Sequence, residues 1–299
     1  MGFFKEQVSI ILPTYNRADI VRRAIGSVLA QTYTNLELIV VDDGSSDDTE
    51  KSVLGFGDQR IVYLKNQQNR GPSGARNFGI KAARGHFISF VDSDDEWANT
   101  KLEEQVREIE SASVPVIVLT GMRFLNDSTR QIVEDVTFQH SGYVHSAFFQ
   151  LKTIGLLSML APKDCLEEIG LFDENVTADE IWDIGVRLAE KFEFRTVPRQ
   201  LYIVHLHEKD RQWNKNNLLT SIPYLLSKYS DQAKIYPKWS ASKRLLLGKL
   251  KLHKDLRGEA LHEFSSSIRV YPYLPSAYVL LLAAVLRVPK SFLTPLIGR

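Results

Sequence analysis

Short apolar runs alternate with helical patterns along the first hundred residues of the chain. Between the first two runs, apolar residues recur at helical spacing from Ile20 to Leu29, which predicts a helix with one buried face. Strands that are apolar along nearly their whole length and are separated by helices are typical of a parallel sheet covered on both faces. The pattern therefore predicts an α/β fold. Its first four strands are expected at residues 8–12, 36–41, 61–64 and 87–91.

Beyond about residue 112 the alternation becomes less regular. From about residue 216 the pattern is helical, with a leucine cluster at 245–250. We therefore expect three segments, 1–112, 113–215 and 216–299. The remaining predicted elements are helices at 75–83, 101–110 and 181–191, and strands at 114–120, 131–138, 158–162 and 202–204.

Composition narrows the functional classes. The chain has 37 Lys and Arg against 36 Asp and Glu, so it lacks the basic excess typical of proteins that bind nucleic acid non-specifically. Its one cysteine, Cys165, excludes an internal disulfide and a Cys-rich zinc site, and is expected in a core. The longest apolar stretch, 277–286, is about half of the roughly 20 residues that span a bilayer. With no signal-peptide pattern, a cytoplasmic protein that does not bind nucleic acid is expected.

Polar residues follow three of the predicted strands, at 13–16, 42–45 and 92–95. Ligands of such sheets bind outside the carboxyl ends of the strands. At 92–95 the sequence Asp-Ser-Asp-Asp places three carboxylates in four positions, which repel one another unless a cation or hydrogen-bond donors offset the charge. Carboxylates spaced in this way suit a hard divalent ion, whereas the plainer interpretation is a solvated turn before a helix.

Two further sequence features point to a binding site at the same edge of the predicted sheet. Asp42-Asp43-Gly44-Ser45 ends a buried strand, so it is either an ordinary strand-to-helix turn or a place where an acid binds a base or a sugar hydroxyl. Arg76 follows a glycine-rich loop and is either a surface arginine or a contact for a phosphate or nucleobase. Three polar strand ends on one edge favour a nucleotide pocket more than any one of them does alone.

Several ordered segments resemble family 2 glycosyltransferases. They are SIILPTYNR (9–17), SVLAQTY (27–33), LIVVDDGSSD (38–47), GPSGARN (71–77) and DSD (92–94), with LFDEN (171–175) and WD (182–183) extending the likeness. The resemblance implies a GT-A fold, a Rossmann-like and mostly parallel sheet flanked by helices. It implies that the segment 1–112 is a nucleotide-sugar-binding half and that 113–215 is an acceptor-binding half. The helical pattern at 216–299 predicts a helical extension.

The same resemblance implies an inverting transfer from a nucleotide-diphosphate sugar, a UDP-sugar being expected, to a hydroxyl of a glycan or lipid-linked glycan. By position in the motifs, Asp94 is the principal ligand of Mg²⁺ or Mn²⁺, and Asp92 reaches the metal or the ribose. Arg76 would lie beside the nucleobase. The residues that would contact the nucleobase are Pro13, Thr14, Tyr15 and Asp43.

The general base is where the sequence departs from the family. Members commonly carry Glu-Asp before Trp-Asp, and the Asp is the usual base, but here Ile181 stands in that position. An isoleucine cannot accept a proton. Glu180 or Asp179 could take over through a small shift of the helix start, or both acids could merely cap the helix, where negative charge is favoured. In that last case the chain would bind a nucleotide sugar or glycan without efficient transfer.

His205 and His207 follow the strand at 202–204 and, spaced by two, would point to the same side. Such a pair could serve a diphosphate or a metal. The alternative is that each is a hydrogen-bonded structural histidine. We keep His205 as a possible pocket residue and favour the structural interpretation for His207.

The C-terminal residues 216–299 lie outside the resemblance. They are interpreted either as a helical hairpin that packs on the catalytic domain or as a surface that contacts a membrane peripherally, through the apolar 277–286 stretch and nearby basic residues. A haloacid-dehalogenase-type phosphatase is disfavoured because three strand–helix units precede the Asp-Ser-Asp segment. A dinucleotide oxidoreductase is disfavoured because no G-x-G-x-x-G follows the first strand.

Overall fold

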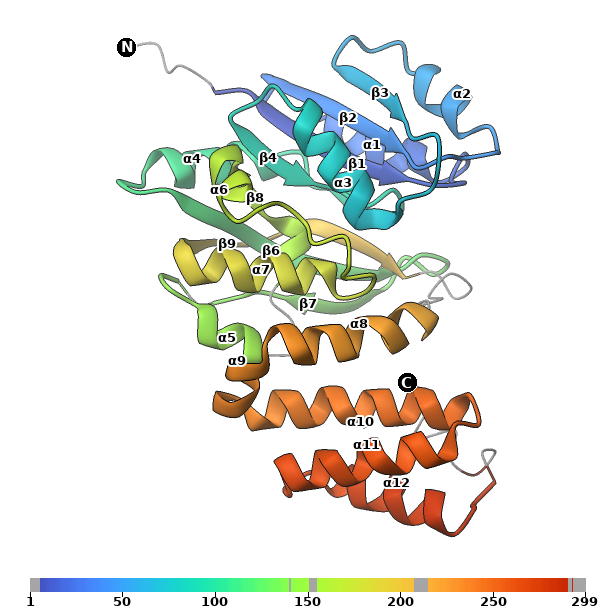
Figure 1. The fold of residues 1–299 in the computed structure, drawn as a ribbon. Helices are drawn as coiled ribbons and strands as arrows, with labels where there is room; N and C mark the ends of the chain where they lie inside the picture. Colours follow the sequence, from blue (N-terminus) through green and yellow to red (C-terminus); the bar gives the residue numbers. More distant parts are fainter. Residues whose placement is uncertain (1–5, 140, 151–154, 207–214, 290–291, 293–299) are drawn as a thin grey trace. The chain divides into compact units, whose positions relative to one another are not determined.

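The computed structural model describes residues 6–139, 141–150, 155–206, 215–289 and 292. Nine strands within these residues form one sheet in the order β3-β2-β1-β4-β8-β6-β9-β5, with β7 paired to β6 (Figure 1). The strands are β1 (Val8–Thr14), β2 (Leu36–Asp42), β3 (Ile61–Lys65), β4 (Phe87–Phe90), β5 (Glu96–Trp97), β6 (Val116–Asn126), β7 (Ile132–Val136), β8 (Leu160–Pro162) and β9 (Glu193–Leu206).

Twelve helices are described alongside a short 3₁₀ turn at Leu156–Ser158. The first seven are α1 (Val21–Leu29), α2 (Thr49–Leu54), α3 (Gly71–Ala82), α4 (Lys101–Glu110), α5 (His145–Gln150), α6 (Lys163–Glu168) and α7 (Glu180–Lys191). The other five are α8 (Lys215–Lys228), α9 (Ser230–Ile235), α10 (Pro237–His253), α11 (Arg257–Val270) and α12 (Pro275–Val285).

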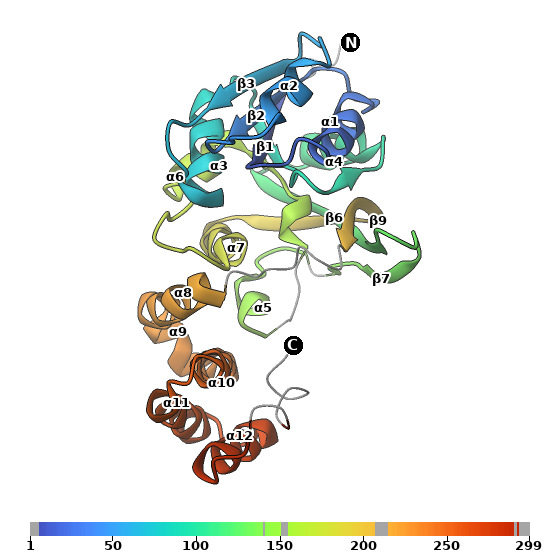
Figure 2. The ribbon, with the colours of Figure 1, turned by 90° about the vertical axis from the view of Figure 1, so that its right-hand side faces the viewer.

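The predicted parallel half of the sheet is confirmed. Strands β3, β2, β1 and β4 are parallel, and the register pairs Thr14 with Asp42 and Ile11 with Phe90. Helices α1 and α4 lie on one side of these strands and α3 and α6 on the other, as Figure 2 shows. The polar residues that follow β1, β2 and β4 therefore emerge at the same edge of the sheet.

The second half of the sheet is mixed, because β8 is antiparallel to β4 and β6 while β6 and β9 are parallel. Strands β6 and β9 extend well beyond the expected 114–120 and 202–204. Strand β5 was not predicted, since two residues carry no periodicity. It pairs antiparallel with β9, and α4 begins at Lys101, as predicted. Cys165 is buried as expected, and burial raises the pKa of its thiol to about 12.

Close packing of α3 on the sheet depends on Gly79. A Cβ at this position would lie 2.5 Å from Cγ2 of Ile11 and 3.1 Å from Cγ2 of Val41. We predict that Gly79→Ala lowers the free energy of unfolding by about 1–3 kcal/mol through overpacking. Gly26 of α1 is the matched control, because a Cβ there meets nothing within 4 Å. Gly26→Ala should stabilise by up to about 1 kcal/mol, and denaturant unfolding of both variants measures the difference. Equal effects at the two positions would contradict this packing.

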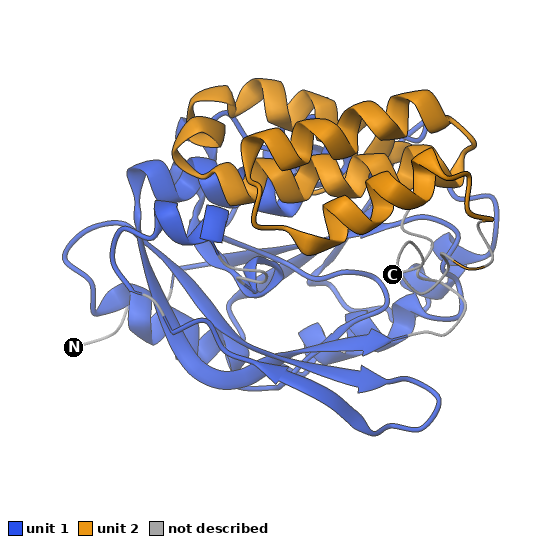
Figure 3. Cartoon of the chain, turned by 90° about the horizontal axis from the view of Figure 1, so that it is seen from below, with its two compact units in different colours: residues 1–174, 180–211 blue, residues 175–179, 212–299 orange. Residues whose placement is uncertain are grey.

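The chain divides into two compact units (Figure 3). Unit 1 comprises residues 1–174 and 180–211 and holds the sheet, and unit 2 comprises 175–179 and 212–299. In unit 2, α10 packs against α8 and α11, and α12 against α11. Helices α10 and α11 approach closely at Gly248, where a Cβ would lie 2.5 Å from the Phe264 ring. Within the described residues, none of the helices has the length and hydrophobicity to cross a bilayer.

Candidate functional site

The carboxyl ends of β1 and β2 form the first part of the site. Pro13 and Thr14 end β1, and Tyr15 follows with about half of its surface exposed. The Thr14 hydroxyl is buried and finds no hydrogen-bond partner among the described residues. Beside it, Asp42 is fully buried, and its carboxylate accepts hydrogen bonds from the Ser45 amide (2.6 Å) and the Tyr63 hydroxyl (2.5 Å).

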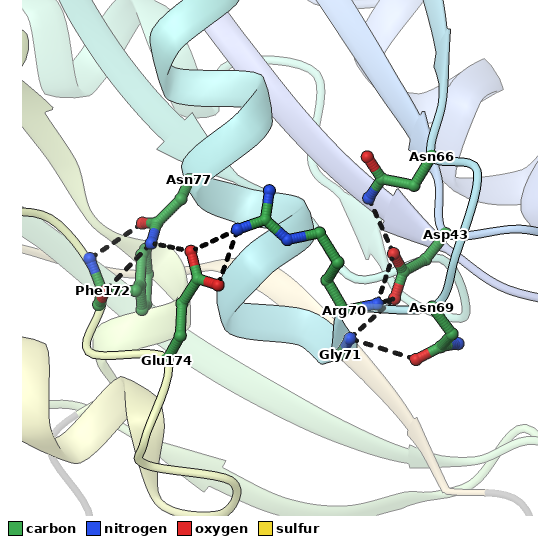
Figure 4. Close-up of polar contacts among 8 residues, drawn as sticks. All are labelled: Asp43, Asn66, Asn69, Arg70, Gly71, Asn77, Phe172 and Glu174. Atoms are coloured by element: carbon green, nitrogen blue, oxygen red, sulfur yellow. Dashed lines mark hydrogen bonds and ion pairs between the residues drawn. The ribbon is translucent and has the colours of Figure 1, made fainter.

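Asp43 caps the N-terminus of α3 from the neighbouring loop (Figure 4). Its carboxylate accepts hydrogen bonds from the backbone amides of Arg70 (3.0 Å) and Gly71 (2.8 Å) and from Nδ2 of Asn66 (2.7 Å). The first amides of a helix have no partner within it, so a carboxylate there satisfies them and interacts favourably with the helix dipole. Gly71 has a φ of 72°, which favours glycine at this turn.

The glycine-rich residues 71–74, expected as a loop, form the first turn of α3. A second set of contacts joins α3 and the residue before it to the segment at 171–175 (Figure 4). Both carboxylate oxygens of Glu174 accept hydrogen bonds from Arg70 (2.8 and 3.1 Å), and Asn77 donates a third at 3.1 Å. Asn77 also pairs with the backbone N–H and C=O of Phe172, each at 2.9 Å. Burial raises the pKa of Glu174, but the bonds from Asn77 and Arg70 outweigh it and lower the pKa overall.

Arg76 is the central cation of the site. Its side chain is only 3% exposed, and its two terminal nitrogens reach Oδ1 of Asp92 (2.8 Å) and Oε1 of Glu180 (2.9 Å). Its guanidinium also lies over the Phe172 ring. Burial lowers the pKa of Arg76, but the charges of Asp92 and Glu180 outweigh it and raise the pKa overall. Arg76 is therefore no surface arginine: it bridges carboxylates that come from two distant parts of the sequence.

The Asp-Ser-Asp-Asp segment lies between β4 and β5. It is not a fully solvated turn, because Ser93 and Asp95 are buried while Asp92 and Asp94 are partly exposed. Burial and then the charges of Asp92 and Asp94 raise the pKa of Asp95 well above its usual range. The charges of Asp92 and Asp94 thus act on Asp95, so the three side chains lie close to one another.

The carboxylates of the Asp-Ser-Asp-Asp segment suit a hard divalent cation. Within the described residues, no three His, Cys, Asp or Glu side chains form a ready-made metal-binding group. Asp92 and Asp94 would supply two oxygen ligands. That number suits Mg²⁺ or a similar ion, which usually keeps several waters and also binds substrate phosphates.

His205 is buried behind this segment, on β9. Its Nδ1 lies 2.8 Å from Asp127 and its Nε2 3.1 Å from Glu96, while its backbone amide donates to Asp95 (3.1 Å). Burial and then Arg23 lower the pKa of His205, against the opposing effect of Glu96 and Asp127. Both ring nitrogens and the backbone amide of His205 thus contact groups of the protein itself. His207 lies outside the described residues.

Arg23 of α1 was not predicted as a site residue. Its Nη2 donates to the backbone carbonyl of Asp94 at 2.5 Å, and its Nη1 donates to Asp127 at 2.6 Å. It therefore fixes the backbone at Asp94, the second aspartate of the Asp-Ser-Asp segment at 92–94, called the DxD segment below. Sequence reasoning missed it because Arg23 lies on a helix with ordinary amphipathic spacing, and no local pattern marks its partner.

The two acids considered as general base have different surroundings. Glu180 is the first residue of α7 in unit 1, is 15% exposed on its side chain, and pairs with Arg76 as described. Asp179 belongs to unit 2, has a φ of 65°, and forms an ion pair with Lys243 of α10. Ile181 follows both. Each acid is thus already held by a cation, but only Glu180 shares its cation with the DxD segment.

Comparison with known proteins shows which family the chain belongs to. A family model described as "Glycosyl transferase family 2" matches residues 9–154. The UDP-Glc:alpha-D-GlcNAc-diphosphoundecaprenol beta-1,3-glucosyltransferase WfgD of Escherichia coli is 52% identical over 99 residues, which cover 33% of this chain and 39% of WfgD. The chain thus spans about two fifths of that relative. The putative colanic acid biosynthesis glycosyl transferase WcaA of E. coli K12 is 30% identical over 234 residues, 74% of this chain and 78% of WcaA.

A solved structure matches the fold along almost the whole chain. The mannosyltransferase PcManGT of Pyrobaculum calidifontis, solved with GDP-Man and Mn²⁺, has a TM-score of 0.60 at 18% identity, over 98% of this chain and 83% of that one. The mixed sheet, flanking helices and C-terminal helices correspond to GT-A glycosyltransferase structures. By its motifs, its fold and its relationship to WcaA, this chain belongs to glycosyltransferase family 2.

Proposed function

We propose that this protein is an inverting glycosyltransferase that moves a sugar from a UDP-sugar to a hydroxyl of a lipid-linked glycan. One observation carries the proposal: Arg76 donates to Asp92 and to Glu180 at once. The candidate base and the first carboxylate of the DxD segment are therefore held around one guanidinium. A displacement reaction needs such groups positioned about the same substrate before the chemistry begins.

The nucleotide is proposed to lie at the carboxyl ends of β1 and β2. Pro13, Thr14 and Tyr15 would line the nucleobase, and the unpartnered Thr14 hydroxyl offers a buried polar group there. Asp43 would contact the base while also holding the start of α3, so its main contribution is a rigid pocket wall. Arg76 would act through Asp92 and Glu180, since both of its terminal nitrogens are already engaged.

Asp94, with Asp92, would hold Mn²⁺ or Mg²⁺. When bound, that ion would neutralise negative charge on the departing diphosphate. The contribution of the chain itself is orientation. Arg23 fixes the Asp94 carbonyl, and Arg76 fixes the Asp92 carboxylate. His205 would support the same segment from behind through the Asp95 carboxylate.

Glu180 is proposed as the general base. Arg76 donates to its Oε1, so Oε2 is the oxygen that would receive the proton of the acceptor hydroxyl. Inversion by a single displacement needs no covalent intermediate with the protein. Asp179 is the weaker candidate because its cation, Lys243, has no described contact with the Asp-Ser-Asp segment, whereas Arg76 joins Glu180 to Asp92.

The donor and acceptor classes rest on WfgD, whose name gives UDP-Glc as donor and a GlcNAc-diphosphoundecaprenol as acceptor. We carry over the chemical class, a UDP-sugar and a lipid-linked glycan, and not the particular sugars. The substitution at Ile181 supports a second candidate, a GT-A protein that binds its ligands without efficient transfer. The Glu180 variants discussed below separate the two.

Nucleotide binding tests the proposal directly. We expect UDP to bind the wild-type protein more tightly with Mn²⁺ than without it in calorimetric titrations. Asp94→Ala should weaken binding by roughly tenfold or more only when the metal is present, because each charged ligand contributes a few kcal/mol at most. Asp135→Ala on β7 is the matched control, since Asp135 is paired with Arg123 away from this edge.

Two results would change the conclusion. Metal-dependent binding of GDP, dTDP or CMP in place of UDP would keep the transferase and change its donor. If no nucleotide bound under any condition, the proposed transfer reaction would be withdrawn and family membership alone would stand.

A further inference from the structure

Helix α12 in unit 2 is apolar on both of its sides and contains no charged residue. Its inner side packs against α10 and α11 in one hydrophobic cluster. Because a helix that is apolar all round is usually buried all round, the second apolar side requires a partner. The inner side consists of Ala277, Leu280, Ala283 and Ala284.

The outer side of α12 is exposed. Spacings of one, four, seven and eight residues place its apolar side chains in a single stripe along the helix. Scattered exposed leucines are ordinary, but five neighbouring apolar side chains form a patch of the kind that marks an interaction surface. The members of this stripe and their exposed fractions are Tyr278 (45%), Val279 (49%), Leu282 (59%), Val285 (58%) and Leu286 (65%).

The part of the sequence that contains this stripe carries only positive charge. Glu263 is the last acidic residue of the sequence, and residues 264–299 contain four basic residues and no acidic ones. Of these cations, Arg269 at the end of α11 and Arg287 just after Leu286 are exposed. Tyr273, also exposed, adds an aromatic ring of the kind found where proteins meet the lipid headgroup layer.

Most other basic residues of unit 2 are engaged inside the unit. Lys243 pairs with Asp179, Lys251 with Glu263, and Arg257 donates to the carbonyl of Ala284. These three cations are therefore held by contacts within the unit. Arg269 and Arg287, by contrast, are exposed near the ends of the α12 stripe.

We infer that the outer side of α12 binds the surface of an anionic phospholipid bilayer. An apolar stripe flanked by cations matches an interface of acyl chains and anionic headgroups. The 11 residues of α12 are too few to span a bilayer, so the helix would lie in the headgroup layer. A second copy of the chain is the poorer partner, because packing two such stripes together would bring the exposed cations Arg269 and Arg287 of both copies close to one another.

This inference goes beyond the proposed transfer reaction, although it would bring the enzyme to the surface that holds a lipid-linked acceptor. It is tested without donor or acceptor. Flotation of the full chain is measured with vesicles of phosphatidylcholine alone and with phosphatidylglycerol added. UDP binding of the same preparation is measured separately, so failure of one proposal is distinguishable from failure of the other.

The wild-type protein should float with the anionic vesicles and much less with the neutral ones. Leu282→Ser with Val285→Ser should weaken partitioning by roughly tenfold or more, because two apolar side chains no longer enter the bilayer. Arg269→Glu with Arg287→Glu should also weaken partitioning by roughly tenfold or more, because each cation lost weakens it about fivefold. Ile132→Ser with Val133→Ser on β7 is the matched control, since these residues are 55% and 58% exposed and should leave flotation unchanged.

Thermal unfolding of each variant verifies that the surface changes leave the fold intact. Equal flotation of the α12 variant and the β7 control would overturn the inference. A wild-type protein that floats with neither vesicle type would also overturn it. Such a protein could instead form a dimer that Leu282→Ser with Val285→Ser dissociates. In that last case a second copy, and not lipid, covers the stripe.

Discussion

Replacing Glu180 by Gln is expected to lower kcat by roughly two to four orders of magnitude, the usual contribution of a general base. The substitution keeps the shape of the side chain, and a Gln Oε1 can still accept the hydrogen bond from Arg76. Donor binding should therefore stay nearly unchanged. Initial rates of UDP release with a lipid-linked acceptor, together with the Kd for UDP, measure the two quantities in the same variant.

Asp179→Asn is the matched comparison for Glu180→Gln, because the two acids are adjacent and each is paired with a cation. If Glu180 is the base, Asp179→Asn should retain most of the wild-type kcat. A collapse of turnover in Asp179→Asn with normal turnover in Glu180→Gln would reverse the assignment. Normal turnover in both variants would show that neither Glu180 nor Asp179 is the general base. A wild-type protein that binds UDP without transferring the sugar would favour the non-catalytic alternative.

Replacing Arg76 by Met should have the largest effect on stability. The change leaves the carboxylates of Asp92 and Glu180 beside each other without their shared cation. Removing one partner of a buried ion pair costs about 3–5 kcal/mol, and the partial exposure of Asp92 (29%) places this case near 3 kcal/mol. Turnover should also fall by roughly 100-fold, because displacement of a reacting group by about 1 Å is enough for that loss.

Arg76→Lys and Arg187→Met separate the effect of Arg76 on stability from its effect on turnover. A lysine offers one point charge and cannot bridge two carboxylates as a guanidinium does, so Arg76→Lys should recover stability more than turnover. Arg187 pairs with the buried Asp183 on α7, outside the proposed site. Arg187→Met should therefore lower the free energy of unfolding and leave UDP affinity unchanged. If Arg76→Met lost stability alone, Arg76 would be structural and the observation that carries the proposed function would fail.

The parallel half of the fold was predictable because its information is local. The apolar runs at 8–12, 36–41 and 87–91 are buried along their whole length, with Ser9, Glu37 and Ser89 as their polar members, whereas the edge strand at 61–64 is partly buried. The polar residues that follow them must then share one edge of the sheet. The later strands were predicted less well, because burial along β9 is irregular and the ends of β6 and β9 are set by pairing with distant partners.

The sequence by itself determined the family, the GT-A sheet and the edge where Thr14, Asp43 and Asp92 lie, since strand order and motif spacing follow from local patterns. Only the tertiary structure decided the partners of the charged groups. Arg76 meets Glu180 across 104 residues, and Asp179 meets Lys243 across 64. Such pairs depend on how separate elements pack, because a buried charge must find its counterion wherever the fold brings one close. That physical requirement placed Glu180, and not Asp179, beside the DxD segment.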